Sequence, residues 1–100
     1  MIAVTSEFRS KPGEEREVER ITLALAERAL KDEPGCGGYT VTVTRSRHDP
    51  RLYSTFERYV DDAALAEHSR APHFREAFEQ LMEHLEAPPR IAIFDSLTGA

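Results

Sequence analysis

The residues best suited to chemistry in this sequence are two histidines, His68 and His73, on either side of Ala71-Pro72. Because histidine titrates near neutral pH, one in an aromatic-lined pocket can act as a general base toward a phenolic O–H. The alternative is structural: either ring can hold the chain break together by donating an N–H to a backbone carbonyl. We favour the structural alternative for His73, at the corner of the pocket wall, and keep both open for His68.

Two helices separated by Pro72 must position these histidines. Proline lacks an N–H and restricts the preceding residue to extended geometry, so it ends the first helix, while its fixed φ lets it begin the second. We expect the first helix to start near Asp61 or Asp62. In the second helix, apolar residues recur at helical spacing and form one stripe, which would make an aromatic-lined pocket wall: Phe74, Ala77, Phe78, Leu81 and Leu85.

Four strands and one further helix complete the pattern. Alternating residues predict the strands, and a 3.6-residue apolar repeat predicts the helix: residues 2–9, 39–45, 52–59 and 90–96 for the strands, and 14–31 for the helix. The order β-α-β-β-α-β predicts an α+β, ferredoxin-like fold with a four-stranded antiparallel sheet and helices on one face. We expect a single domain over residues 1–100, with 97–100 as a frayed tail.

Strand alternation also divides the sheet into two faces. We assign the more apolar set to the face that the helices cover: Ile2, Val4, Phe8, Val41, Val43, Leu52, Phe56, Ile91 and Ile93. The other face is mixed and largely uncharged: Ala3, Thr5, Glu7, Thr40, Thr42, Thr44, Tyr53, Thr55, Tyr59, Ala92 and Phe94. A sheet face in water usually carries more Lys and Glu, so we predict that this face forms a homodimer. The alternative is a monomer with a threonine-rich wet face.

Composition restricts the partners and the compartment. The 100 residues are 40% hydrophobic and 31% charged, which is typical of a soluble globular protein rather than a disordered one. A net charge of −5 without a Lys/Arg cluster disfavours nucleic-acid binding. No apolar run approaches the ~20 residues of a membrane span, and no signal-peptide pattern is present. Cys36 is the single cysteine, so we expect a reducing, cytoplasmic compartment.

The spacing of the candidate ligands does not match a known cofactor site. His68 and His73 are separated by a proline break, and the sequence contains neither His-Glu-x-x-His nor Cys-x-x-Cys. Gly35, Gly37 and Gly38 lead into a strand instead of joining a strand to a helix, so they lack the context of a phosphate-binding loop. We therefore expect no metal and no cofactor.

Residues 63–74, AALAEHSRAPHF, resemble the signature of the antibiotic biosynthesis monooxygenase domain, whose members include small quinol monooxygenases. The resemblance extends to the Lys11-Pro12-Gly13 turn, the EPGC segment at 33–36, and a third strand that ends in an aromatic residue. It implies a dimeric α+β barrel, in which two such sheets pack back to back.

The resemblance also implies an oxygenase that uses no cofactor, so the substrate must supply the electrons. A base deprotonates a small aromatic quinol or polyketide-type phenol, the anion reduces O2, and the peroxide collapses to a quinone. Our catalytic candidates are His68 as the base and Tyr53 and Tyr59 as donors to the anion. The expected substrate-binding residues are Arg58, His73, Phe56, Phe74, Phe78 and Met82. For the phenylalanines and Met82 the alternative is plain core packing, which we favour for Phe74 and Phe78.

Other activities of the same scaffold stay open or are disfavoured. A related branch degrades haem with a tryptophan, a first-strand asparagine and an axial histidine. This sequence has no Trp; His68 stands at the tryptophan position and Phe78 at the axial position, so haem degradation is not expected. A non-enzymatic dimer that binds a small aromatic ligand or serves in stress remains an alternative, as does an isomerase or decarboxylase.

Overall fold

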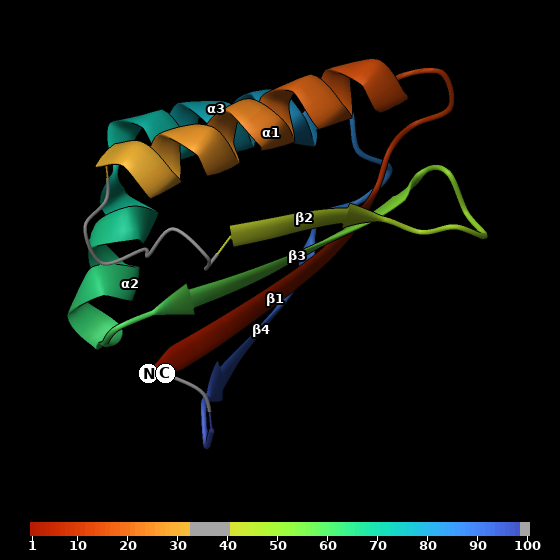
Figure 1. The fold of residues 1–100 in the computed structure, drawn as a ribbon. Helices are drawn as coiled ribbons and strands as arrows, with labels where there is room; N and C mark the ends of the chain where they lie inside the picture. The colour runs from red at the N-terminus through yellow and green to blue at the C-terminus, as the bar shows by residue number, and fades with distance from the viewer. Residues whose placement is uncertain (33–40, 99–100) are drawn as a thin grey trace.

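The computed structural model describes residues 1–32 and 41–98, and its elements follow the predicted order (Figure 1). They are β1 (Ile2–Arg9), α1 (Glu15–Asp32), β2 (Val41–Arg45), β3 (Leu52–Tyr59), α2 (Asp62–Arg70), α3 (Pro72–Met82) and β4 (Arg90–Asp95). The start of the predicted second strand, the glycine cluster and Cys36 lie outside the described residues.

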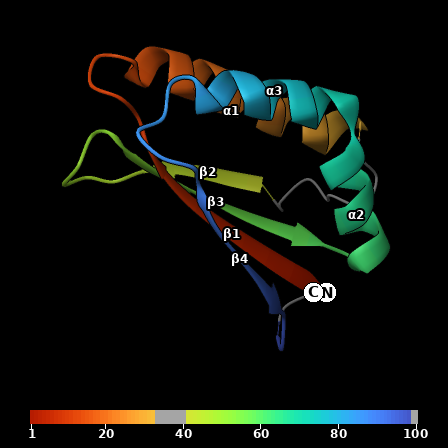
Figure 2. The same ribbon diagram turned by 180° about the vertical axis from the view of Figure 1, so that it is seen from behind.

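The four strands form one antiparallel sheet in the order β2-β3-β1-β4. Figures 1 and 2 show α1 and α3 side by side over one face, with α2 at the end of the sheet. The α+β, ferredoxin-like fold with helices on one face is therefore confirmed. Its helix-covered face holds two buried clusters, one around Phe8 and Val18 and one around Val4 and Tyr59.

The predicted faces of β3 are reversed in the structure. Tyr53 and Tyr59 are 2% and 1% exposed and lie in the two core clusters, whereas Phe56 is 45% exposed on the uncovered face. The register explains this reversal, because β1 pairs Val4 with Glu57 and Thr5 with Phe56, and directly paired residues share a face. The assignment of Leu52 and Phe56 to the core face was therefore wrong, as was that of Tyr53, Thr55 and Tyr59 to the outer face.

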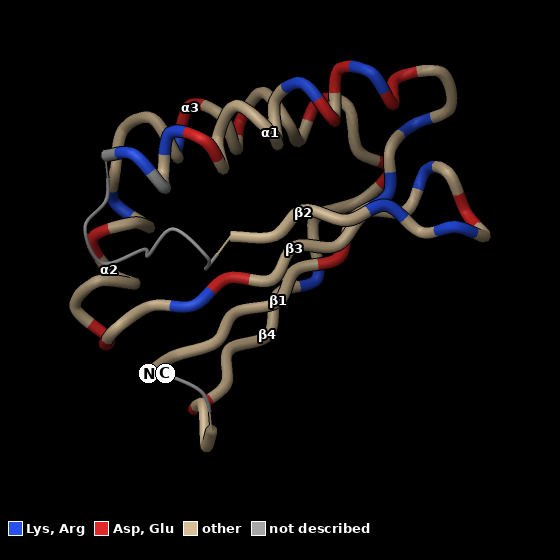
Figure 3. The backbone as a smooth tube through the Cα atoms, viewed as in Figure 1, with Lys and Arg blue, Asp and Glu red and all other residues tan. Residues whose placement is uncertain are grey.

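The opposite face of the sheet carries no helix (Figures 1 and 2). In Figure 3 the strands are mostly tan, whereas charged residues of both signs crowd the helices and loops. Phe56 and Phe94, which is 52% exposed, are the large apolar residues of this outer face. Two of its few charges, Glu7 and Arg90, are cross-strand partners. The outer face therefore offers a mainly uncharged surface around two aromatic rings.

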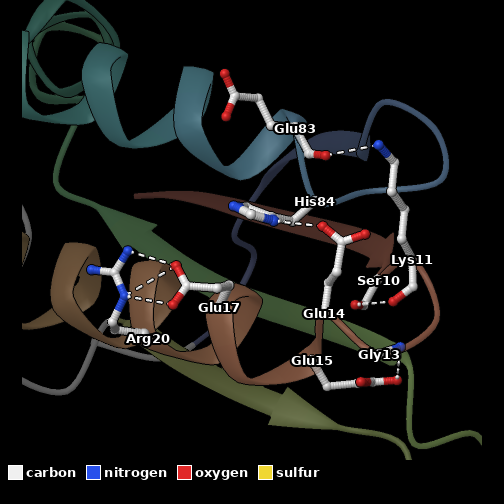
Figure 4. Close-up of polar contacts among 9 residues, drawn as sticks. All are labelled: Ser10, Lys11, Gly13, Glu14, Glu15, Glu17, Arg20, Glu83 and His84. Carbon is white, nitrogen blue, oxygen red and sulfur yellow. Dashed lines mark hydrogen bonds and ion pairs between the residues drawn. The ribbon is translucent and has the colours of Figure 1, made fainter.

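The ends of α1 and α3 are tied to the turn after β1 (Figure 4). His84 Nδ1 lies 2.7 Å from Oε1 of Glu14, and Lys11 Nζ donates to the backbone carbonyl of Glu83 at 2.8 Å. Gly13 has φ +84°, a left-handed geometry that glycine adopts without strain. His84 is thus half-buried and links the ends of the two helices.

The predicted break at Pro72 separates α2 from α3. Ala71 has φ −61° and ψ 129°, the extended geometry that a following proline favours, and Pro72 is the first residue of α3. At the other end of α2, Asp61 is the N-cap, and its Oδ1 accepts a hydrogen bond from the Ala64 N–H at 2.8 Å. This cap fixes the start of the short helix that carries His68.

We expect Asp61→Ala to lower the free energy of unfolding by about 1 kcal/mol, because it removes the acceptor for an otherwise unpaired helix N–H. Asp61→Asn keeps a capping oxygen and should retain most of this stability. Urea unfolding of both variants beside the wild type measures the difference. Equal losses in the two variants would contradict the capping role.

Candidate active site

A cavity of about 220 Å³ lies between the helices and the sheet. Its walls are mostly apolar and come from all four strands and all three helices of the described chain, with aromatic rings at the α2–α3 corner. This volume is below the roughly 300–1,000 Å³ typical of sites for drug-sized ligands, so the cavity suits a compound of one or two fused rings. Most of its polar groups lie on β3 and α2.

Strand geometry and the α2 cap place these polar groups together. On β3, alternation directs Thr55, Glu57 and Tyr59 toward the helices, one after another along the same face. His68 is the buried residue of α2, with only 6% exposure, and it faces the same cavity. The site therefore joins one strand to the helix that follows it.

Glu57 is the centre of the polar group. Its Oε1 accepts a hydrogen bond from the Tyr59 hydroxyl at 2.7 Å and lies 3.8 Å from Nε2 of His68. Its Oε2 accepts from Thr55 Oγ1 at 3.5 Å, and Thr55 is itself hydrogen-bonded to Ser6. The Glu57 side chain is only 17% exposed, so this carboxylate contacts protein on most sides.

Aromatic rings hold the His68 imidazole in place. The Tyr59 and Phe74 ring centroids lie 5.4 and 4.5 Å from that of His68, and Phe78 follows 5.7 Å beyond Phe74. An imidazole beside a carboxylate in an apolar enclosure can accept a proton from a bound O–H, because the carboxylate stabilises the imidazolium that forms. The geometry thus suits general base chemistry on a flat aromatic ligand.

The structure separates the predicted site residues into two groups. His68, Tyr59, Phe74 and Phe78 line the cavity together. The others lie apart from its lining: Tyr53, Phe56, Arg58, His73 and Met82. Of these, Met82 packs against the Phe8 cluster, and His73 is half-buried near the start of α3.

Two of the separated residues, Phe56 and Arg58, belong to the outer face of the sheet. Arg58 pairs across the strands with Ala3, and its Nη2 donates to Ser96 Oγ at 3.4 Å and to the Thr98 carbonyl at 3.3 Å. The sheet therefore stands between these two side chains and the cavity, which places them apart from a ligand bound there.

Tyr53 serves the core at the other end of the sheet. Its ring stacks on Phe8 at 5.8 Å, and its hydroxyl donates to Glu19 Oε2 at 2.7 Å, beside Arg45. Burial raises the pKa of Tyr53 to about 12, and the hydrogen bond to Glu19 contributes to the shift. The same hydrogen bond lowers the pKa of Glu19. The Tyr53 hydroxyl is thus a structural donor.

The raised pKa of Tyr53 predicts a loss of stability in alkali. Because the folded-state pKa of about 12 exceeds the ordinary value of 10.0, this contribution is complete below pH 10.0 and is lost as pH rises toward 12. Tyr53→Phe should lower stability by about 1 kcal/mol at neutral pH and flatten the loss between these two pH values. Urea unfolding of the wild type and of Tyr53→Phe across this pH range measures the effect. Identical pH profiles of the two proteins would contradict this role of Tyr53.

Glu57 was not among the site residues predicted from the sequence. A signal was present, because strand alternation puts Glu57 on the same face as Tyr59, which was a candidate. Because Tyr59 and its neighbours on β3 were assigned to the outer face of the sheet, Glu57 was not expected to line a cavity under the helices. Glu57 lies between Thr55 and Tyr59 on the same face of β3, and a carboxylate between two uncharged residues of a buried face is the signal that could have identified it.

The described residues, 1–32 and 41–98, contain no group of three or more His, Cys, Asp or Glu side chains arranged to hold a metal ion. His68 and Glu57 form a pair without a third such neighbour in that set. In the same part of the chain, none of the helices has the length and apolar character needed to span a membrane.

Known structures with the same fold are numerous. A solved antibiotic biosynthesis monooxygenase superposes with a TM-score of 0.87 over 98% of this chain and 100% of its own, at 22% identity, which shows the shared fold. A protein from Caulobacter crescentus is 27% identical, with a TM-score of 0.89 and coverage of 97% of this chain and 90% of that one. A conserved protein from Methanosarcina mazei is 29% identical, with a TM-score of 0.85 and coverage of 93% and 89%.

The sequence itself matches a family model. The model described as antibiotic biosynthesis monooxygenase aligns with residues 1–80, which include β1, both sides of the polar group and most of α3. The matched part holds Glu57, Tyr59 and His68, whereas β4 lies beyond it. The chain therefore belongs to the antibiotic biosynthesis monooxygenase family.

Proposed function

We propose that this protein is a monooxygenase that oxidises a small aromatic quinol or polyketide-type phenol with O2, without a cofactor. The observation that carries the proposal is the buried His68 beside the Glu57 carboxylate, at the end of an apolar cavity that accommodates one or two rings. Family membership supports the proposed reaction class, and the size and apolar lining of the cavity support the proposed substrate class.

In the proposed reaction His68 removes the proton from a phenolic O–H, and Glu57 stabilises the resulting imidazolium. The phenolate passes electrons to O2, and a C–O bond forms at a ring carbon that bears hydrogen. Loss of water from this hydroperoxide breaks its O–O bond and leaves a carbonyl. One oxygen atom thus enters the product, the other leaves as water, and the substrate supplies all the electrons.

The aromatic residues of the cavity would orient the substrate ring. Phe74 and Phe78 lie in sequence along α3, with tilted rings that leave flat apolar surfaces beside His68. Binding a ring here holds its hydroxyl close to the imidazole and excludes water from the phenolate, both of which favour reaction.

Oxygen consumption by the purified, metal-stripped protein tests the proposal against a panel of hydroquinones and naphthols, which have one or two rings. We expect protein-dependent uptake above autoxidation for at least one of these substrates, with one O2 consumed and one of its oxygen atoms incorporated per product molecule. Saturable binding of the same compounds without uptake would instead support the non-enzymatic binding protein and overturn the monooxygenase.

We also propose that the outer sheet face forms a homodimer. Phe56 and Phe94 are exposed there by 45% and 52%. Exposed apolar patches of this kind mark interaction surfaces, and two sheets can pack face to face about 10 Å apart. Because β3 directs Phe56 outward, its ring lies on the same face of the sheet as Phe94.

A further inference from the structure

The side-chain hydroxyls that line the cavity already have acceptors within the protein. Thr22 donates to the Val18 carbonyl at 2.7 Å, and Ser69 donates to the Leu65 carbonyl at 3.0 Å. These are bonds from a helical side chain to the carbonyl four residues earlier. Because a hydroxyl has only one hydrogen to donate, neither group can offer it to a ligand without losing an internal bond.

The hydroxyls on the sheet are engaged in the same way. Tyr59 and Thr55 both donate to the Glu57 carboxylate, at 2.7 and 3.5 Å, and Ser6 pairs with Thr55. The polar wall of the cavity is thus organised around an acceptor that draws in its neighbouring donors. A ligand meets oxygen lone pairs there more readily than N–H or O–H groups.

The formal charges of the cavity also favour a ligand that donates hydrogen bonds and carries no negative charge. Among the described residues that line the cavity, Glu57 is the one carboxylate, and no lysine or arginine is present. Most of the remaining lining is hydrocarbon or aromatic, so charges within it are screened less than in water. A ligand with a carboxylate would meet a like charge and, apart from His68, no side chain that could carry a compensating one.

We propose that Glu57 is a specificity-determining residue that admits uncharged hydrogen-bond-donating aromatic compounds to this cavity and excludes aromatic carboxylates of the same size. The inference rests on the proposed function only in taking the cavity as the substrate site. It narrows the substrate class to neutral hydroxyarenes, whose O–H can be donated to the acceptor-rich wall.

Two nearly isosteric ligands test the proposal: 2-naphthamide, which is neutral and donates, and 2-naphthoate, which is anionic and accepts. Isothermal titration of the wild type at about pH 8, above the ordinary pKa of histidine, should give at least roughly tenfold weaker binding of the naphthoate. Glu57→Gln removes the charge with little change of shape and should bring the two dissociation constants within about threefold.

Glu67→Gln provides the matched control, because Glu67 is an exposed carboxylate on α2 outside the cavity lining. It makes the same change in net charge and should keep the wild-type preference. Equal affinities in the wild type, binding of neither ligand, or discrimination that persists in folded Glu57→Gln would overturn the proposal. The comparison of the two ligands on the wild type tests the proposal even if Glu57→Gln fails to fold. Oxygen uptake is measured separately, so a selective cavity without turnover would refute only the monooxygenase.

Discussion

Replacing His68 with glutamine should lower protein-dependent oxygen uptake by roughly 10²- to 10⁴-fold, the usual contribution of a positioned general base. His68 is 6% exposed and lies 3.8 Å from Glu57, so it is enclosed with the group that would stabilise its protonated form. Glutamine keeps a polar side chain between Tyr59 and Phe74 but cannot accept the substrate proton. The loss should appear mainly in kcat, because the aromatic walls that bind the ring remain.

His48→Gln is the matched control for this experiment. His48 is exposed in the turn between β2 and β3, outside the cavity lining, so its replacement should leave oxygen uptake unchanged. Both variants need circular dichroism and sedimentation to establish folding and assembly. If folded His68→Gln retained more than about a third of wild-type uptake, His68 would not be the base.

The topology of this chain could be predicted because each element carries a local signal. Pro72 sets the α2–α3 boundary through its missing N–H. The alternation of apolar and polar residues gives the limits of β1 and β3. These signals act over a few residues and do not depend on partners distant in the sequence. The α+β order, the kink and the polar cap at Asp61 follow from them.

The orientation of β3 could not be predicted in the same way. Alternation defines two faces but not which one meets the helices, and Leu52 and Phe56 are the more apolar set by composition. Pairing with β1 determines which face of β3 is buried, because Glu57 lies opposite the buried Val4. The buried tyrosines are tolerated because their hydroxyls reach carboxylates: Tyr53 donates to Glu19 and Tyr59 to Glu57.

The candidate site illustrates the same limit. His68 on α2 and the aromatic residues of α3 were identified because helical periodicity places each of them on the apolar side of its own helix. Glu57 comes from a neighbouring strand and was overlooked because its face had been assigned to the outside. Arg58, the next residue along the chain, was predicted to bind the substrate and lies on the opposite face of the sheet. Assigning β3 to the wrong face therefore places Arg58 in the predicted site in place of Glu57, a residue of opposite charge.

The second large effect concerns assembly. We expect the wild type to sediment as a dimer and Phe94→Asp to weaken association by roughly 10²-fold or more, as for an interface aromatic of central importance. Phe94 is 52% exposed on β4 and shares the outer face with Phe56, so an aspartate there would place a charge between two apolar surfaces. Sedimentation velocity over a range of protein concentrations measures the change. Phe56→Asp changes another strand of the same face and should give the same result.

Leu23→Asp separates interface effects from the general effect of adding a charge. Leu23 is 54% exposed on α1, on the opposite side of the sheet from Phe94, so this variant should remain dimeric. A monomeric wild type, or a Phe94→Asp variant that associates as tightly as the wild type, would contradict the interface. Phe94 lies on the outer face and outside the cavity lining, so a folded monomeric variant would also show whether the cavity binds ligand without a partner subunit. If ligand affinity persists in that monomer, each subunit holds a complete site and the dimer serves to cover the aromatic face.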